Sequence, residues 1–131
     1  MIEVHVGELH AVAKSGEGNM TLSLVGTADT SAESALNELL GRLHGELQKS
    51  GVRVVVVDLH ELEFMNSSCF KSFITWIVAV RRLPEDQHYK IRFRPNAAMH
   101  WQKRSLHAIC YFGGDLVSIE HVDEAIAEHR R

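Results

Sequence analysis

The fold is decided by residues 51–83, GVRVVVVDLHELEFMNSSCFKSFITWIVAVRRL. The stretch opens with a nearly unbroken β-branched run at residues 52–57, which predicts a strand buried on both faces of a parallel sheet. Three helix-capping side chains follow at Asn66, Ser67 and Ser68, and residues 69–83 then have the pattern of a half-apolar helix. A strand, a polar turn and a helix N-terminus gather backbone N–H groups and hydroxyls at one point. We therefore expect a functional site at this turn.

Size and composition indicate one soluble domain. The chain has 131 residues, of which 45% are hydrophobic and 24% charged, enough for a single hydrophobic core. The formal net charge of -3 gives no overall basic field for nucleic acid or an anionic membrane. No apolar run is long enough to span a bilayer, and the N-terminus lacks the build of a signal peptide. We expect a cytoplasmic protein, and Cys69 and Cys110 agree with a reducing compartment.

The residues before this stretch predict a hairpin and an amphipathic helix. Residues 2–6 alternate as a strand does, and the alternation continues on the other parity to Ala13, with a bulge or bend at Gly7. A turn at residues 15–19 leads to a second strand at residues 20–25. Thr30 and Glu33 have the spacing of a capping box, and leucines at three- and four-residue steps predict a helix over residues 32–49.

The residues after it alternate between strands and helices. Residues 88–94 and 116–119 predict strands, Asn96 predicts the cap of a helix over residues 97–110, and residues 124–128 predict a final helix. The apolar side of the third helix is predicted to hold Trp101, Ser105, Ala108 and Ile109. The order ββαβαβαβα predicts one α/β domain over residues 1–131, with a mixed, mostly parallel sheet of about five strands covered by helices.

This order, with VVVVDLHELEFMNSSCF at its centre, resembles the STAS fold of anti-sigma-factor antagonists. In the family pattern an apolar strand ends in an Asp, and an Asp-Ser-Ser/Thr-Gly turn then starts a helix. Asp58 matches the acid at the strand end, and residues 66–68 match the turn. Two positions depart from the pattern, because Asn66 stands where Asp is usual and Cys69 where Gly is usual.

The resemblance implies a protein-binding module of signalling, without enzyme activity or cofactor. Its partner would be an anti-sigma factor that is also a serine kinase, and the phosphorylated residue would be Ser67, with Ser68 as the alternative. Phosphorylation would release the partner, since a phosphoserine adds about -1.5 to -2 charges. The turn would be shaped by Asp58, Asn66, Ser68 and Cys69, and the expected partner contacts are Met65, Phe70 and Ile74.

Two other functions stay open. The first is a STAS scaffold without phosphorylation, a subunit of a larger signalling or lipid-transport assembly. The second is a small enzyme that uses Cys69, although no sequence signature supplies a base beside it. On a helical wheel Cys69 shares the arc of Phe73, Trp76 and Val80, which favours a small core residue. Phe70, Ile74 and Val78 lie at the edge of that arc and fit a partner surface or a neighbouring helix equally well.

The remaining motifs predict no further chemistry. Nine histidines are present without an HxH, HExxH or Cys-x-x-Cys spacing, so we expect no metal site. A basic flank on the third predicted helix lacks interleaved aromatic residues, and a solvated face explains it better than nucleic-acid binding. That flank consists of His100, Lys103, Arg104 and His107. The sequence leaves open whether the domain forms homo-oligomers.

Overall fold

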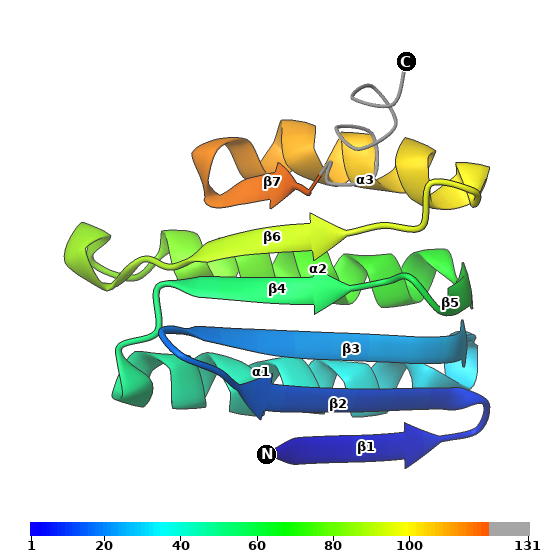
Figure 1. The fold of residues 1–131 in the computed structure, drawn as a ribbon, viewed down its shortest axis with the longest axis horizontal. Helices are drawn as coiled ribbons and strands as arrows, with labels where there is room; N and C mark the ends of the chain where they lie inside the picture. The colour runs from blue at the N-terminus through cyan, green and yellow to red at the C-terminus, as the bar shows by residue number, and fades with distance from the viewer. Residues whose placement is uncertain (121–131) are drawn as a thin grey trace.

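Seven strands in one sheet organise residues 1–120, the part of the chain that this computed structural model describes (Figure 1). The spatial order is β1-β2-β3-β4-β6-β7, and β5 pairs with the end of β3 beside this path. The strands are β1 (Ile2–Val6), β2 (Leu9–Ser15), β3 (Asn19–Ala28), β4 (Val54–Asp58), β5 (Leu62–Met65), β6 (Lys90–Arg94) and β7 (Val117–Ile119). The α-helices are α1 (Glu33–Ser50), α2 (Ser67–Arg81) and α3 (His100–Gly113).

The sheet is mixed and mostly parallel, as the sequence predicted. The β1–β2 and β2–β3 pairs are antiparallel, whereas β3–β4, β3–β5, β4–β6 and β6–β7 are parallel. In Figure 1 α1 and α2 pass behind the strands, and α3 lies at the β7 edge. Crossover helices between parallel strands place the carboxyl ends of β3, β4, β5 and β6 at one end of the sheet.

The β-branched run behaves as predicted in the centre of the sheet. Val55 and Val57 on one face of β4 are fully buried, and Val56 on the other face is only 5% exposed. Val56 lies between Thr21 of β3 and Arg92 of β6, whose aliphatic stem is long enough to cover it. Burial on both faces is therefore confirmed for this strand.

Two segments differ from the predicted strands. Gly7 is not a bend within one long strand, because Val6 pairs with Leu9 and the chain reverses between them. Gly7 has φ +55°, a conformation that glycine adopts without strain in a two-residue hairpin turn. The second segment is β5, where the sequence analysis predicted no strand; it pairs in parallel with the last residues of β3. These two segments raise the strand number from about five to seven.

Helix α1 covers the sheet with its predicted leucines, but its start differs from the prediction. The chain first forms a 3-10 turn, η1 (Thr30–Ala32), capped by Asp29, whose carboxylate accepts from the Ser31 N–H at 3.0 Å. Thr30 is therefore not the cap of a capping box with Glu33. The helix ends at Gly51 with φ +71°, as the Ser-Gly sequence predicted. Its buried residues are Leu36, Leu39, Leu40, Leu43 and Leu47.

Helix α3 begins three residues later than predicted and turns a different face to the core. The Asn96 side chain accepts from the Ala98 N–H at 2.9 Å, so it caps the turn before the helix. Trp101 is half-buried and packs against the core, and Ile109 is buried, as predicted, whereas Ala108 is exposed, against the prediction. The buried residues are Gln102, Leu106, Ile109 and Gly113. The predicted helix at residues 124–128 lies outside the described residues.

Gln102 explains the rotation of α3. Its side chain is fully buried, and its amide N–H groups donate to the carbonyl oxygens of Leu59 at 2.7 Å and Leu62 at 2.8 Å. Its own carbonyl accepts from the Asn96 N–H at 2.7 Å. Through these three hydrogen bonds the buried Gln102 amide holds the loop between β4 and β5 against α3. That loop leads directly into β5 and the turn that follows it.

A second buried hydrogen-bond chain joins α1 to α2. Trp76 Nε1–H donates to the Tyr89 hydroxyl at 2.7 Å, and that hydroxyl also contacts His44 Nδ1. Because Trp76 can only donate, the Tyr89 proton is free to bond with His44 Nδ1 as the acceptor. Burial lowers the pKa of His44 and raises the pKa of Tyr89, so both groups are held neutral.

Candidate functional site

Two polar turns meet where β3 and β5 end. Because Ala28 and Met65 are partners in the parallel β3–β5 pair, the residues that follow them emerge side by side. The first turn consists of residues 29–31, and the second, which we name the Ser67 turn, consists of residues 66–68. The Asn66 N–H donates to the Ala28 carbonyl oxygen at 2.7 Å and joins the two turns through the backbone. Both lie at the right-hand end of the sheet in Figure 1.

Asn66 uses both ends of its amide at this junction. Its Oδ1 accepts from the N–H and from the hydroxyl of Ser68, each at 2.8 Å, which caps α2. Its Nδ2 donates to Thr30 Oγ1 of the neighbouring turn at 3.1 Å. An ionised aspartate would keep the cap but could not donate to Thr30. At this position the amide donates to Thr30, whereas a carboxylate could only accept from the Thr30 hydroxyl.

The two serines of the turn have different surroundings. Ser67 is the first residue of α2 and is exposed, whereas Ser68 is half-buried and its hydroxyl is engaged by Asn66. The first turn of α2 contains no acidic residue, and Lys71 lies exposed four residues after Ser67. The N–H groups of residues 68–70 already bond to Asn66, so it is the positive end of the helix dipole that favours an anion at this position.

Cys69 points into the protein. Its side chain is fully buried, and its Sγ donates to the Asp29 carbonyl oxygen at 3.3 Å. Burial raises the pKa of the thiol, and the negative charge of Glu33 raises it further. A buried thiol held in its protonated form is a poor nucleophile. Cys69 also packs with the apolar residues of α2, which confirms its predicted place in the core. Its side chain therefore does not fill space in the Ser67 turn.

Asp58 does not join the Ser67 turn. It lies at the end of β4, where its Oδ1 accepts from the His60 N–H at 2.9 Å. Its Oδ2 lies 3.6 Å from Arg94, which also bonds to Glu120 at 3.1 Å. The contacts of Asp58 therefore stabilise the β4–β5 loop and the neighbouring end of β6.

The predicted partner contacts differ in exposure. Met65 is 4% exposed and belongs to the core, so it offers no surface to a partner. Phe70 and Ile74 are half-buried, and the Phe70 ring packs edge-on against Trp101 of α3 at a centroid distance of 6.1 Å. Packing against a neighbouring helix is thus confirmed for Phe70. Phe64, which the sequence analysis did not select, is 50% exposed.

Two further sequence predictions concern surface residues. Within residues 1–120 no three His, Cys, Asp or Glu side chains come together as a metal site. The basic flank of α3 lines a shallow hollow of about 370 Å³, and all four of its side chains are exposed. Among these same described residues, no helix has the length and apolar character needed to cross a membrane.

Comparisons with known proteins identify the fold. No family model matches the sequence, and no curated protein matches it. An anti-sigma factor antagonist from Mycobacterium paratuberculosis superposes with a TM-score of 0.64 at 15% identity, over 94% of this chain and 95% of that chain. The anti-sigma factor antagonist SpoIIAA in its unphosphorylated form gives a TM-score of 0.58 at 15% identity, over 92% of this chain and 96% of that chain.

The class of the domain follows from this likeness. The chain has the α/β fold of anti-sigma factor antagonists, the STAS fold, and the predicted resemblance is confirmed at the level of the fold.

Proposed function

We propose that this protein is a regulatory binding module of the anti-sigma factor antagonist type, switched by phosphorylation of Ser67. The observation that carries the proposal is the exposed Ser67 hydroxyl at the start of α2, beside a Ser68 hydroxyl that Asn66 already engages. The fold shared with two anti-sigma factor antagonists, one of them described as unphosphorylated, supports the same function. The protein itself performs no catalysis in this proposal.

The chemistry of the turn suits a phosphoserine. A partner kinase would transfer the γ-phosphoryl group of ATP to Ser67 Oγ, releasing ADP, with the hydroxyl proton passing to a base of the kinase. The phosphate would lie at the positive end of the α2 helix dipole. Lys71, at the i+4 position, would pair with it across one turn of the helix. The domain would thus accept the phosphate without refolding.

The same phosphate would disturb a partner that covers the turn. Added charge at an interface that lacks a matching cation is disfavoured by desolvation, so the partner would dissociate. The apolar part of the contact would come from Phe64, which is half-exposed three residues before Ser67, and from the exposed edges of Phe70 and Ile74. Half-exposed aromatic residues beside a polar switch are typical of reversible interfaces.

Phosphate transfer and partner binding test this function together. The purified protein is incubated with ATP and each serine-kinase-type anti-sigma factor encoded in the genome of its source, and the phosphorylated residue is located by mass spectrometry. We expect one phosphate on Ser67, none on Ser67→Ala, and normal transfer to the matched control Ser68→Ala. The dissociation constant of the kinase should rise at least tenfold for the phosphorylated chain.

A STAS scaffold without phosphorylation is the second candidate, and Asn66 favours it. Asn66 replaces the acidic residue of the family pattern, and its amide is committed to Thr30. If the protein binds a kinase-type partner tightly but takes up no phosphate under turnover conditions, the scaffold function replaces the switch. If it binds none of these partners, both candidates fail.

A further inference from the structure

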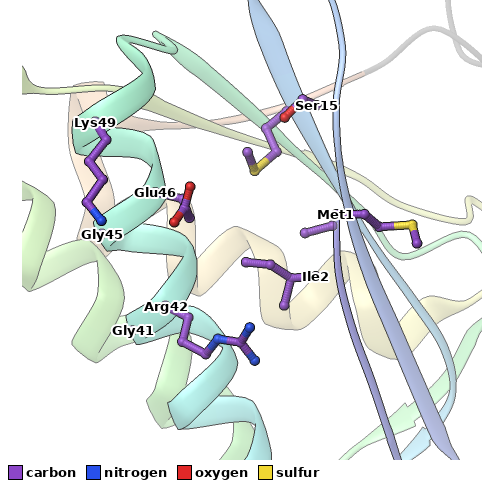
Figure 2. A pocket seen from close by; sticks show the side chains of 10 residues that line it. Met1, Ile2, Ser15, Gly41, Arg42, Gly45, Glu46 and Lys49 are labelled. Carbon is purple, nitrogen blue, oxygen red and sulfur yellow. The ribbon is translucent and has the colours of Figure 1, made fainter.

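A hollow of about 440 Å³ lies between α1 and the sheet, away from the Ser67 turn (Figure 2). One wall is the second half of α1, with Arg42, Glu46 and Lys49 beside two glycines. The opposite wall comes from the sheet, and Figure 2 shows Ile2 of β1 pointing across the gap toward α1. The volume falls within the range of about 300–1,000 Å³ that is common for small-molecule sites.

Gly41 and Gly45 add no side chains to the helical wall of this hollow. Glycine is the poorest helix former apart from proline, yet both glycines lie inside α1. Neither has a positive φ, and a Cβ added at either position would meet no atom within 4 Å in the described part of the chain. Neither backbone conformation nor close packing therefore requires glycine at these positions. Their effect is to leave room beside the helix for another group.

The lining of the hollow combines apolar and cationic groups. Ala13 and Met20 are buried members of the core, and Ile2 is half-buried beside them. Arg42 and Lys49 are exposed, and neither takes part in the ion pairs of residues 1–120, which are Glu3–His10, Asp58–Arg94 and Arg94–Glu120. With Glu46 between them the local balance is one positive charge, although the whole chain carries -3.

We propose that this hollow binds a small amphipathic anion, an aliphatic chain that ends in a carboxylate or phosphate. The chain would lie along the glycine wall and against Ile2 and Met20, where methionine adapts its shape to a flexible apolar ligand. The anionic head would meet Arg42 and Lys49 at the rim. The proposal does not depend on the regulatory function, because the hollow and the Ser67 turn share no residue.

A titration followed by amide NMR tests the site. Decanoate, used below its micelle-forming concentration, should give saturable shifts of the Gly41 and Gly45 amide signals. Decanol, which lacks the charge, should bind at least fivefold more weakly, and inorganic phosphate alone should give no saturable shift. Decyl phosphate and a lysophospholipid form two further arms: binding of the first alone indicates a free amphiphile, and binding of both indicates a lipid headgroup. Absence of saturable shifts with every chain-bearing anion would overturn the proposal.

Matched variants separate a defined site from general attraction of anions. The double variant Arg42→Gln/Lys49→Gln should weaken decanoate binding about five- to tenfold, and Glu46→Gln should strengthen it, since a repelling charge is removed. The control Lys103→Gln/Arg104→Gln makes the same charge change on α3 and should leave binding unchanged. Equal losses in both double variants would show non-specific attraction and refute the site.

A cavity-filling variant tests the glycine wall. Gly45→Leu should abolish decanoate binding while the melting temperature stays the same or rises, because leucine is a better helix former and its Cβ meets no atom. The smaller change Gly45→Ala should raise the melting temperature and weaken binding less. Normal decanoate affinity in a folded Gly45→Leu protein would contradict the proposal.

Discussion

Replacing Gln102 by methionine should remove a large part of the stability of this domain. Methionine has nearly the same volume as glutamine, so the change leaves no cavity but deletes three hydrogen bonds. The Leu59 carbonyl keeps its bond from the Leu62 N–H at 3.1 Å, while the Leu62 carbonyl and the Asn96 N–H lose their Gln102 partner. A buried polar group without a partner costs about 1–3 kcal/mol. For these two groups together the expected loss is about 2–6 kcal/mol.

Urea unfolding measures this loss. For a slope of about 1–3 kcal/mol per molar urea, the midpoint should fall by roughly 2 M while the slope stays unchanged. The control is Gln48→Met, the same substitution on the exposed side of α1, where the amide makes one bond of 3.3 Å to the His44 carbonyl. Surface changes of this kind stay within about 0.5 kcal/mol. A loss below about 1 kcal/mol for Gln102→Met would refute the assigned role of this amide.

Three further predictions follow from buried and capping groups. Burial lowers the pKa of His44 below its ordinary 6.5, so the folded state favours the neutral ring. The free energy of unfolding should therefore be full above pH 6.5 and decline below it. This decline should be smaller in the variant His44→Asn. Iodoacetamide should modify half-buried Cys110 before fully buried Cys69, and a Cys69 rate equal to that of the unfolded chain would contradict the packing. Asn66→Ala should cost about 1–2 kcal/mol in urea unfolding, whereas Asn66→Asp keeps the cap and should be close to neutral; equal losses would argue against the cap.

Much of the fold could be predicted because it depends on local patterns. The β-branched run of β4, the leucine spacing of α1 and the capping residues before α2 each act over a few residues, and each appears in the expected place. The alternation of single strands with single helices then indicates a parallel sheet. The errors concern features that local patterns do not determine. Strand β5 exists because its backbone pairs with β3, and four residues alone carry no such signal.

The central residues of the candidate site could be picked out from the sequence, but its neighbouring residues could not. Asn66, Ser67 and Ser68 stood out as consecutive capping residues, and they do start α2. Thr30 received a different role because its partner, the Asn66 amide, lies 36 residues away and becomes a neighbour only through the β3–β5 pair. Met65 was predicted to contact a partner, but in β5 it is buried, whereas Phe64 beside it is exposed. Strand β5 does not alternate strictly, because Leu62 and Met65 are buried while Glu63 and Phe64 are exposed; a strand prediction alone would have assigned Phe64 and Met65 to the opposite faces.

The position of a single phosphate tests the proposed function most directly. The protein is incubated with ATP and the serine-kinase-type anti-sigma factors of its own organism, and peptides that contain Ser67 and Ser68 are sequenced by mass spectrometry. The switch predicts one phosphate on Ser67 and a partner that then dissociates. A phosphate on Ser68 with Ser67 unmodified, or a stable complex that turns over ATP and leaves the turn unmodified, would contradict it.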